Sequence, residues 1–157
     1  MFEVTQAQPG RLALLPHPSG DLDDALRQLQ AQGVSLLVSL LPEAEARMLG
    51  LEREAEVCRR IGLGFLWHPV VDYGLPEPAA FDPIIAALAR HVQEGGFVAV
   101  HCRAGIGRSG LTAAAVLIAA GFTAQAAVSH VSAARGVSVP ETEAQRAFLD
   151  DFETRWR

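Results

Sequence analysis

Short apolar runs alternate along the chain with longer segments in which apolar residues recur every three to four positions. A run of about four to eight apolar residues between Gly, Pro or polar residues is typical of a buried strand, and the longer period is typical of a helix. The pattern predicts strands at residues 11–15, 34–40, 64–70 and 97–100. It predicts helices at residues 21–32, 43–61 and 79–94, and three more beyond the fourth strand.

This alternation favours an α/β fold, a single domain with a largely parallel central sheet flanked by helices. The chain has 157 residues, of which 50% are hydrophobic and 20% are charged. These values are ordinary for one globular domain, so we expect residues 1–157 to form a single domain. In such sheets the functional residues gather where the strands end.

Charge and hydropathy narrow the classes of partner. The net charge of −5 disfavours general binding to nucleic acid or to anionic membranes, because a basic patch supplies most of that affinity. No apolar run reaches the roughly 18–20 residues that cross a bilayer, and no leader-like segment opens the chain. We therefore expect a soluble, cytoplasmic protein, with a monomer as the simplest assembly.

The segment after the fourth strand holds the candidate chemistry. From His101 to Gly110 it reads His-Cys-Arg-Ala-Gly-Ile-Gly-Arg-Ser-Gly, and an apolar helix follows. Glycines in this strand-to-helix turn allow successive amides to converge on one oxyanion at the positive end of the helix. Arg108 adds a planar fork that holds two phosphate oxygens at once. The predicted phosphate-binding residues are Arg103, Ala104, Gly105, Ile106, Gly107 and Arg108.

The same turn makes Cys102 a candidate nucleophile. A helix N-terminus and nearby cations favour the thiolate, which is the attacking form of cysteine. We expect His101 to orient the turn through a backbone hydrogen bond. Ser109 is expected to donate its hydroxyl to the sulfur when cysteine leaves.

These residues resemble the signature of the cysteine-dependent protein tyrosine phosphatase superfamily, which is His-Cys, five residues, Arg, then Ser or Thr. His101, Cys102, Arg108 and Ser109 fill all four positions. The resemblance to the small dual-specificity branch implies two-step catalysis through a phosphocysteine, with no cofactor and no metal. A buried cysteine in an ordinary strand-to-helix turn is the alternative interpretation.

A phosphatase of this kind also needs an acid that protonates the leaving oxygen. Asp72 follows the third predicted strand and precedes Cys102 by 30 residues, which resembles the spacing in the dual-specificity branch. An aspartate beside Gly and Pro also suits a simple turn. Glu77 and Asp82 are the fallback acids, although we expect Asp82 to mark the start of a helix.

Residues 135–146 look like the loop that closes the pocket in small members of the family. The resemblance gives Gln145 a part in positioning water. The alternative is a solvent-facing residue on the final helix. Arg135, Glu141 and Thr142 are interpreted as loop-building or helix-capping residues.

Three further features have simple structural interpretations. We expect Cys58 to be a packed core thiol, with a regulatory disulfide to Cys102 as the alternative. The acidic group at residues 21–24 fits the positive end of a helix better than a metal site. Trp67 is interpreted as a core residue, and it and His68 are the residues that could shape the pocket near Asp72.

The function predicted from the sequence is hydrolysis of phosphate monoesters, on phosphotyrosine and also phosphoserine or phosphothreonine in proteins or on small phosphate esters. A phosphoinositide or inositol phosphate is the alternative substrate. The loop has Arg103, Ala104 and Ile106 where lipid-directed members often carry lysine, which favours protein or aryl phosphates. A catalytically weak module that binds phosphorylated partners is the alternative of another class.

Overall fold

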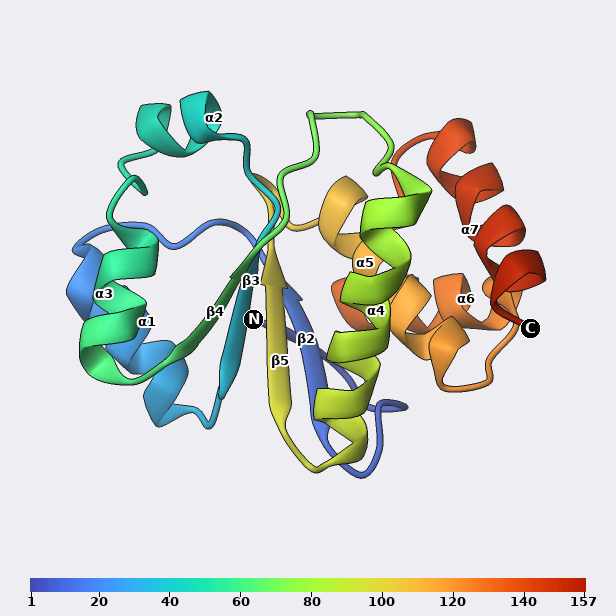
Figure 1. Ribbon diagram of the computed structural model, residues 1–157, viewed down its shortest axis with the longest axis horizontal. Coiled ribbons are helices and arrows are strands. Elements are labelled where there is room, and N and C mark those ends of the chain that lie inside the picture. Colours follow the sequence, from blue (N-terminus) through green and yellow to red (C-terminus); the bar gives the residue numbers. More distant parts are fainter.

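A five-stranded sheet forms the centre of the computed structural model, which describes all residues from 1 to 157 (Figure 1). The strand order is β1-β2-β5-β3-β4, with β1 antiparallel to β2 and the other neighbours parallel. This confirms the predicted α/β fold with a largely parallel sheet. The strands are β1 (Phe2–Val4), β2 (Arg11–Leu15), β3 (Leu36–Ser39), β4 (Gly64–Trp67) and β5 (Phe97–His101).

Helices cover both faces of this sheet. In Figure 1, α1 and α3 lie on one side of the sheet and α4 to α7 on the other, while α2 sits near the carboxyl ends of the strands. The helices are α1 (Leu22–Ala31), α2 (Glu43–Met48), α3 (Glu54–Ile61), α4 (Pro78–Gln93), α5 (Gly107–Ala119), α6 (Ala124–Arg135) and α7 (Glu143–Trp156). No helix is both long enough and apolar enough to cross a membrane.

Successive residues of the central strands point into two different cores. On β2, Leu12 and Leu14 belong to a cluster of 29 buried residues, and Ala13 and Leu15 belong to a second cluster of 11. A strand that is buried on both faces has no polar face to alternate with. This explains why β2, β3 and β5 read as continuous apolar runs.

The register brings the ends of three parallel strands to one level. His101 at the end of β5 pairs with Leu15 of β2 on one side and with Ser39 of β3 on the other. The segments that follow these strands therefore meet at one edge of the sheet, where ligands bind in open α/β folds.

The structure differs from the sequence prediction in several boundaries. The edge strand β1 was not predicted, and the predicted helix at 43–61 is two helices, α2 and α3. The strands predicted at 34–40 and 64–70 are shorter, at Leu36–Ser39 and Gly64–Trp67, although backbone hydrogen bonds between the two segments continue as far as Val70. Asp21 caps α1 by accepting from the amide of Asp24 at 3.0 Å, which accounts for part of the acidic group.

The expectation that Asp82 starts a helix is wrong. Helix α4 begins at Pro78, and the carboxylate of Glu77 caps it by accepting from the Ala80 amide at 3.0 Å. Asp82 lies one turn further along and pairs with Arg155 of α7 at 2.8 Å. The two fallback acids therefore have structural partners of their own.

Candidate active site

The turn after β5 is held from outside by donors that take its carbonyl groups. The carbonyl of Arg103 accepts from the His17 amide at 3.1 Å. The guanidinium of Arg135 donates to the carbonyls of Ala104 at 3.2 Å and Gly105 at 2.9 Å. With its carbonyls fixed outward, the turn directs its amides inward.

Four consecutive amides remain available on the inner side. Those of Arg103, Ala104, Gly105 and Ile106 donate to no protein acceptor. Helix α5 starts directly afterwards, at Gly107. Free amides in a curved turn at the positive end of a 13-residue helix form an anion-binding site.

Gly105 is the position in the turn where glycine is required. Its φ is +69°, and a Cβ there would lie 2.4 Å from the backbone carbon of Leu15. Backbone atoms of β2 cannot move aside as a flexible side chain can. The close approach of Gly105 to the end of β2 therefore fixes the curvature of the turn.

Cys102 lies at the base of this turn, buried, with His101 beside it. The His101 Nδ1 donates to the Cys102 carbonyl at 3.1 Å, the backbone hydrogen bond that the sequence predicted. Its Nε2 lies 2.5 Å from Oε1 of Glu54, a buried carboxylate at the start of α3. Both ring nitrogens therefore face oxygen atoms, which fixes the orientation of the imidazole beside Cys102.

Arg108 is buried and held from three directions. Glu45 of α2 takes two of its donors, at 2.8 and 2.9 Å, and the Val70 carbonyl takes a third at 2.9 Å. Asp72 lies 3.2 Å from Nη2 of the same guanidinium. These contacts use Nη1 and Nη2, which leaves the Nε–H of Arg108 for a ligand.

Burial and pairing act in opposite directions on the charge of Arg108. Burial by itself lowers the pKa of the Arg108 guanidinium. The hydrogen bond to Glu45 and the nearby groups of Cys102 and Asp72 raise it by more, so the pKa of Arg108 lies above its ordinary value. The same hydrogen bond lowers the pKa of Glu45. The pair therefore stays charged at neutral pH, and the turn keeps its cation.

Asp72 lies on an exposed loop between β4 and α4, within reach of Arg108. Its Oδ1 accepts from the Tyr73 amide at 3.1 Å. Tyr73 has a φ of 58°, in the left-handed region that non-glycine residues rarely occupy. The loop thus carries both a partly exposed carboxyl and local backbone strain, a combination that is often found at functional sites.

Gln145 is buried, so the alternative interpretation as a solvent-facing residue is wrong. Its side-chain carbonyl accepts from the amides of Glu141 at 3.0 Å and Thr142 at 3.3 Å, completing a capping box at the start of α7. Its Nε2 donates to the Gly74 carbonyl at 3.4 Å. Gln145 therefore ties α7 to the loop that carries Asp72.

Two other side chains contact the turn or lie within it. Glu141 accepts from the Gly107 amide at 3.0 Å, so one donor of the turn is already occupied by a carboxylate of the chain. The hydroxyl of Ser109 is buried without a hydrogen-bond partner. Donation from this hydroxyl to the Cys102 sulfur stays a prediction.

The interpretation of Cys58 as a core residue is confirmed, whereas that of Trp67 is wrong. Cys58 lies on the buried face of α3 among apolar residues, and burial together with Glu54 raises its pKa to about 12. Trp67 is not a core residue, because 53% of its surface is exposed at the end of β4. His68 is half-buried, its Nε2 has no partner, and burial lowers its pKa.

The sequence analysis brought together Cys102, Arg108 and Asp72 but missed the two carboxylates behind them. Glu45 and Glu54 lie on short helices with many charged residues, and nothing in their local pattern separates them from solvent-facing glutamates. The sequence holds one indirect indication of them. The buried side chains of His101 and Arg108 each need a partner, and a carboxylate is the natural one.

Comparisons with known proteins agree with this geometry. A family model described as "PTP-SAK: Swiss Army Knife protein, DSP-PTPase phosphatase domain" matches residues 4–150. Protein tyrosine phosphatase domain-containing protein 1 of Mus musculus is 31% identical over 150 residues, covering 88% of this chain and 20% of that protein. The chain thus spans a fifth of the length of this curated relative.

Solved structures share the fold. Kinase associated phosphatase, with serine in place of its catalytic cysteine, has a TM-score of 0.85 at 19% identity, covering 99% of this chain and 93% of that one. PTPMT1 in complex with PI(5)P has a TM-score of 0.78 at 22% identity, covering 92% of each chain. Since the family model matches nearly the whole chain, this protein belongs to the dual-specificity phosphatase branch of the cysteine-dependent protein tyrosine phosphatase superfamily.

Proposed function

We propose that the protein hydrolyses phosphate monoesters through a phosphocysteine intermediate, with residues 1–157 acting as one catalytic domain. The observation that carries this proposal is the set of four unpaired amides, Arg103 to Ile106, in the turn between the buried Cys102 and the buried Arg108. Donors fixed in advance around a phosphoryl group stabilise the charge that develops on its oxygens in the transition state.

In the first step the Cys102 thiolate attacks phosphorus in line with the leaving oxygen. The amides and the Nε–Nη2 edge of Arg108 hold the three non-bridging oxygens. The new phosphate contacts replace the contact between Arg108 and Asp72, which frees the carboxyl group of Asp72. Once freed, the exposed carboxylate of Asp72 takes up a proton from solvent, and it gives this proton to the departing oxygen as the P–O ester bond breaks, leaving a phosphocysteine.

In the second step water attacks the phosphocysteine. The Asp72 carboxylate takes a proton from this water, the P–S bond breaks, and inorganic phosphate leaves. The unpartnered hydroxyl of Ser109 donates to the sulfur as it regains its negative charge. Gln145 positions the loop of Asp72 through Gly74, because its amide reaches that backbone rather than open solvent.

We propose phosphotyrosine in proteins as the preferred substrate class. Val71, Tyr73 and Leu75 flank Asp72, and all three are exposed large hydrophobic residues. An apolar rim at the acid loop suits the ring of an aryl ester better than the polyanionic head group of a phosphoinositide. Arg103 is the one residue with a cationic side chain among residues 102–107.

The test compares turnover without metal on an aryl phosphate, a phosphotyrosine peptide, a phosphoserine peptide and a phosphoinositide. Cys102→Ser serves as the blank. Turnover that vanishes in this variant and is fastest on the aryl and phosphotyrosine substrates is the expected result. Turnover fastest on the phosphoinositide contradicts the substrate class, and binding without turnover on all four assigns a phospho-binding module instead.

A further inference from the structure

A cavity of about 390 Å³ lies between α2, α3 and the end of β4, apart from the phosphate-binding turn. Helix α2 separates the two, because Glu43 and Arg47 on one face of the helix line the cavity while Glu45 on another face holds Arg108. No residue of the turn from 102 to 108 lines it. The cavity is therefore a separate site, and its volume falls within the range of small-ligand pockets.

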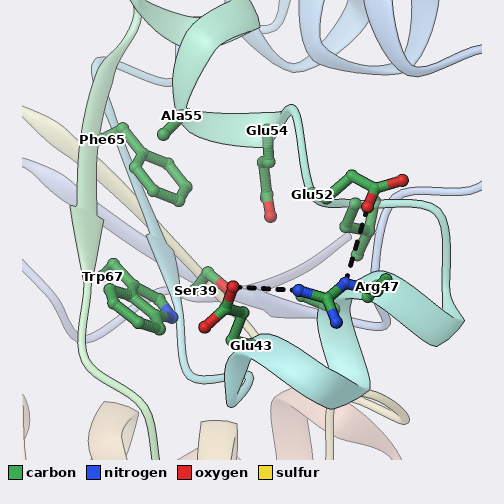
Figure 2. Close-up of a pocket in the computed structure, with 10 residues that line it drawn as sticks. Ser39, Glu43, Arg47, Glu52, Glu54, Ala55, Phe65 and Trp67 are labelled. Atoms are coloured by element: carbon green, nitrogen blue, oxygen red, sulfur yellow. Dashed lines mark hydrogen bonds and ion pairs between the residues drawn. The ribbon is translucent and has the colours of Figure 1, made fainter.

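Aromatic and aliphatic side chains form one wall of the cavity. Figure 2 shows the rings of Phe65 and Trp67 on this side, opposite Arg47. The indole nitrogen of Trp67 donates to the Leu41 carbonyl at 2.7 Å, which fixes the ring while half of its surface remains exposed. A fixed, exposed indole face is a good surface for a cation.

The opposite wall and the floor carry carboxylates. Glu43 and Glu52 hold Arg47 at the rim, with distances of 3.1 and 3.8 Å. Glu54 points from the start of α3 into the cavity (Figure 2), and only 3% of its surface is exposed. Three carboxylates and one guanidinium leave an excess of negative charge in the cavity.

Glu54 offers an acceptor that the protein leaves unused. Its Oε1 is taken by His101 at 2.5 Å, but no protein donor reaches Oε2. Oε2 is not among the fully buried side-chain atoms that lack a partner, so it is open to the cavity that Glu54 lines. The floor of the cavity can therefore accept from a donor of a ligand, and a donor that carries positive charge is favoured.

We propose that this cavity binds an alkylguanidinium group. Its planar cation stacks on Trp67 and donates to Oε2 of Glu54, while its aliphatic stem lies against Phe65. A guanidinium fits better than an ammonium, because it is planar, more weakly hydrated and able to stack on aromatic faces. The rim already pairs carboxylates with this group in Arg47. The group arrives on a free small molecule or as an arginine of a peptide.

The experiment is a titration of the full-length protein, followed by amide and indole NMR shifts in saturating inorganic phosphate. The probes are butylguanidinium, the peptide acetyl-Gly-Arg-Gly-amide, and the same peptide with citrulline, which keeps the shape of arginine without its charge. We expect shifts at α2, α3 and the Trp67 indole, and at least fivefold tighter binding of arginine than of citrulline. Equal affinity of butylguanidinium and the arginine peptide assigns the site to the group alone, and tighter peptide binding assigns it to a partner arginine.

Variants make the assignment specific. Trp67→Ala is expected to weaken arginine binding about two- to fivefold, and Trp67→Phe to retain most of it. Glu94→Gln, at an exposed carboxylate on the far end of α4, is the control and should leave binding unchanged. Equal binding of the citrulline peptide, an unchanged affinity in Trp67→Ala, or shifts confined to residues 103–108 would overturn the proposal. Because binding is measured without turnover, the outcome is independent of the proposed phosphatase activity.

Discussion

Replacing Glu45 by Gln tests whether the buried cation of the active site depends on one carboxylate. Glu45 holds Arg108 through two hydrogen bonds, and the side chains of these residues are only 15% and 3% exposed. Removing one partner of a fully buried pair costs about 3–5 kcal/mol, and a hydrogen bond to a charged group contributes about 1.5–3 kcal/mol. Arg108 keeps the Val70 carbonyl and Asp72 as partners. We therefore expect a loss of about 1.5–3 kcal/mol at pH 7.

The dependence of this loss on pH follows from the pKa of Glu45. The hydrogen bond from Arg108 lowers that pKa below its ordinary value of 4.5. The folded state thus binds this proton less readily than the unfolded chain, so the contribution of Glu45 is complete above pH 4.5. It is lost as the pH falls from there through the lowered pKa of the folded state.

Urea unfolding of the wild type and Glu45→Gln at neutral and acidic pH measures both effects. The difference in unfolding free energy should be full at neutral pH and shrink as the solution is acidified. Glu43→Gln is the matched control, because Glu43 lies on the same helix but is exposed and pairs with an exposed arginine. Its loss should stay within about 0.5 kcal/mol. The reasoning fails if both variants lose the same stability, or if the Glu45→Gln difference persists unchanged in acid.

Three shorter predictions test other parts of the site. Gly105→Ala should abolish aryl phosphate turnover, because the new Cβ would collide with backbone atoms. Gly107→Ala should lower turnover less, because its Cβ would meet only the end of a carboxylate side chain. Equal kcat/KM values for the two variants would refute this reasoning. Asp72→Asn should lower kcat by about 10²–10⁴ for poor leaving groups and remove the alkaline limb of the pH profile, and an unchanged profile would point to another acid. Iodoacetamide at pH 8 should label Cys102 and spare Cys58, whose burial raises its pKa to about 12; peptide mass spectrometry showing equal labelling would contradict this.

The local pattern of the chain predicted four of the five strands, most of the helices and the strand-to-helix turn after β5. Apolar runs are typical of strands buried on both faces. The glycines after β5 indicate a tight turn, because glycine adopts backbone conformations that other residues rarely adopt. The signature from His101 to Ser109 is contiguous, so its chemistry can be recognised without knowing the fold. Asp72 was predicted as the acid because it lies just past the third predicted strand and precedes Cys102 by 30 residues.

Only the tertiary structure decided which side chains support this turn. Glu45 and Glu54 reach Arg108 and His101 across 63 and 47 residues of chain. Gln145 reaches Gly74 across 71 residues. Such contacts depend on how helices dock on the sheet, and the periodicity of a single helix records which face is buried but not which residue it meets. The sequence by itself therefore determined the reacting groups, and the packing of distant helices decided what holds them in place.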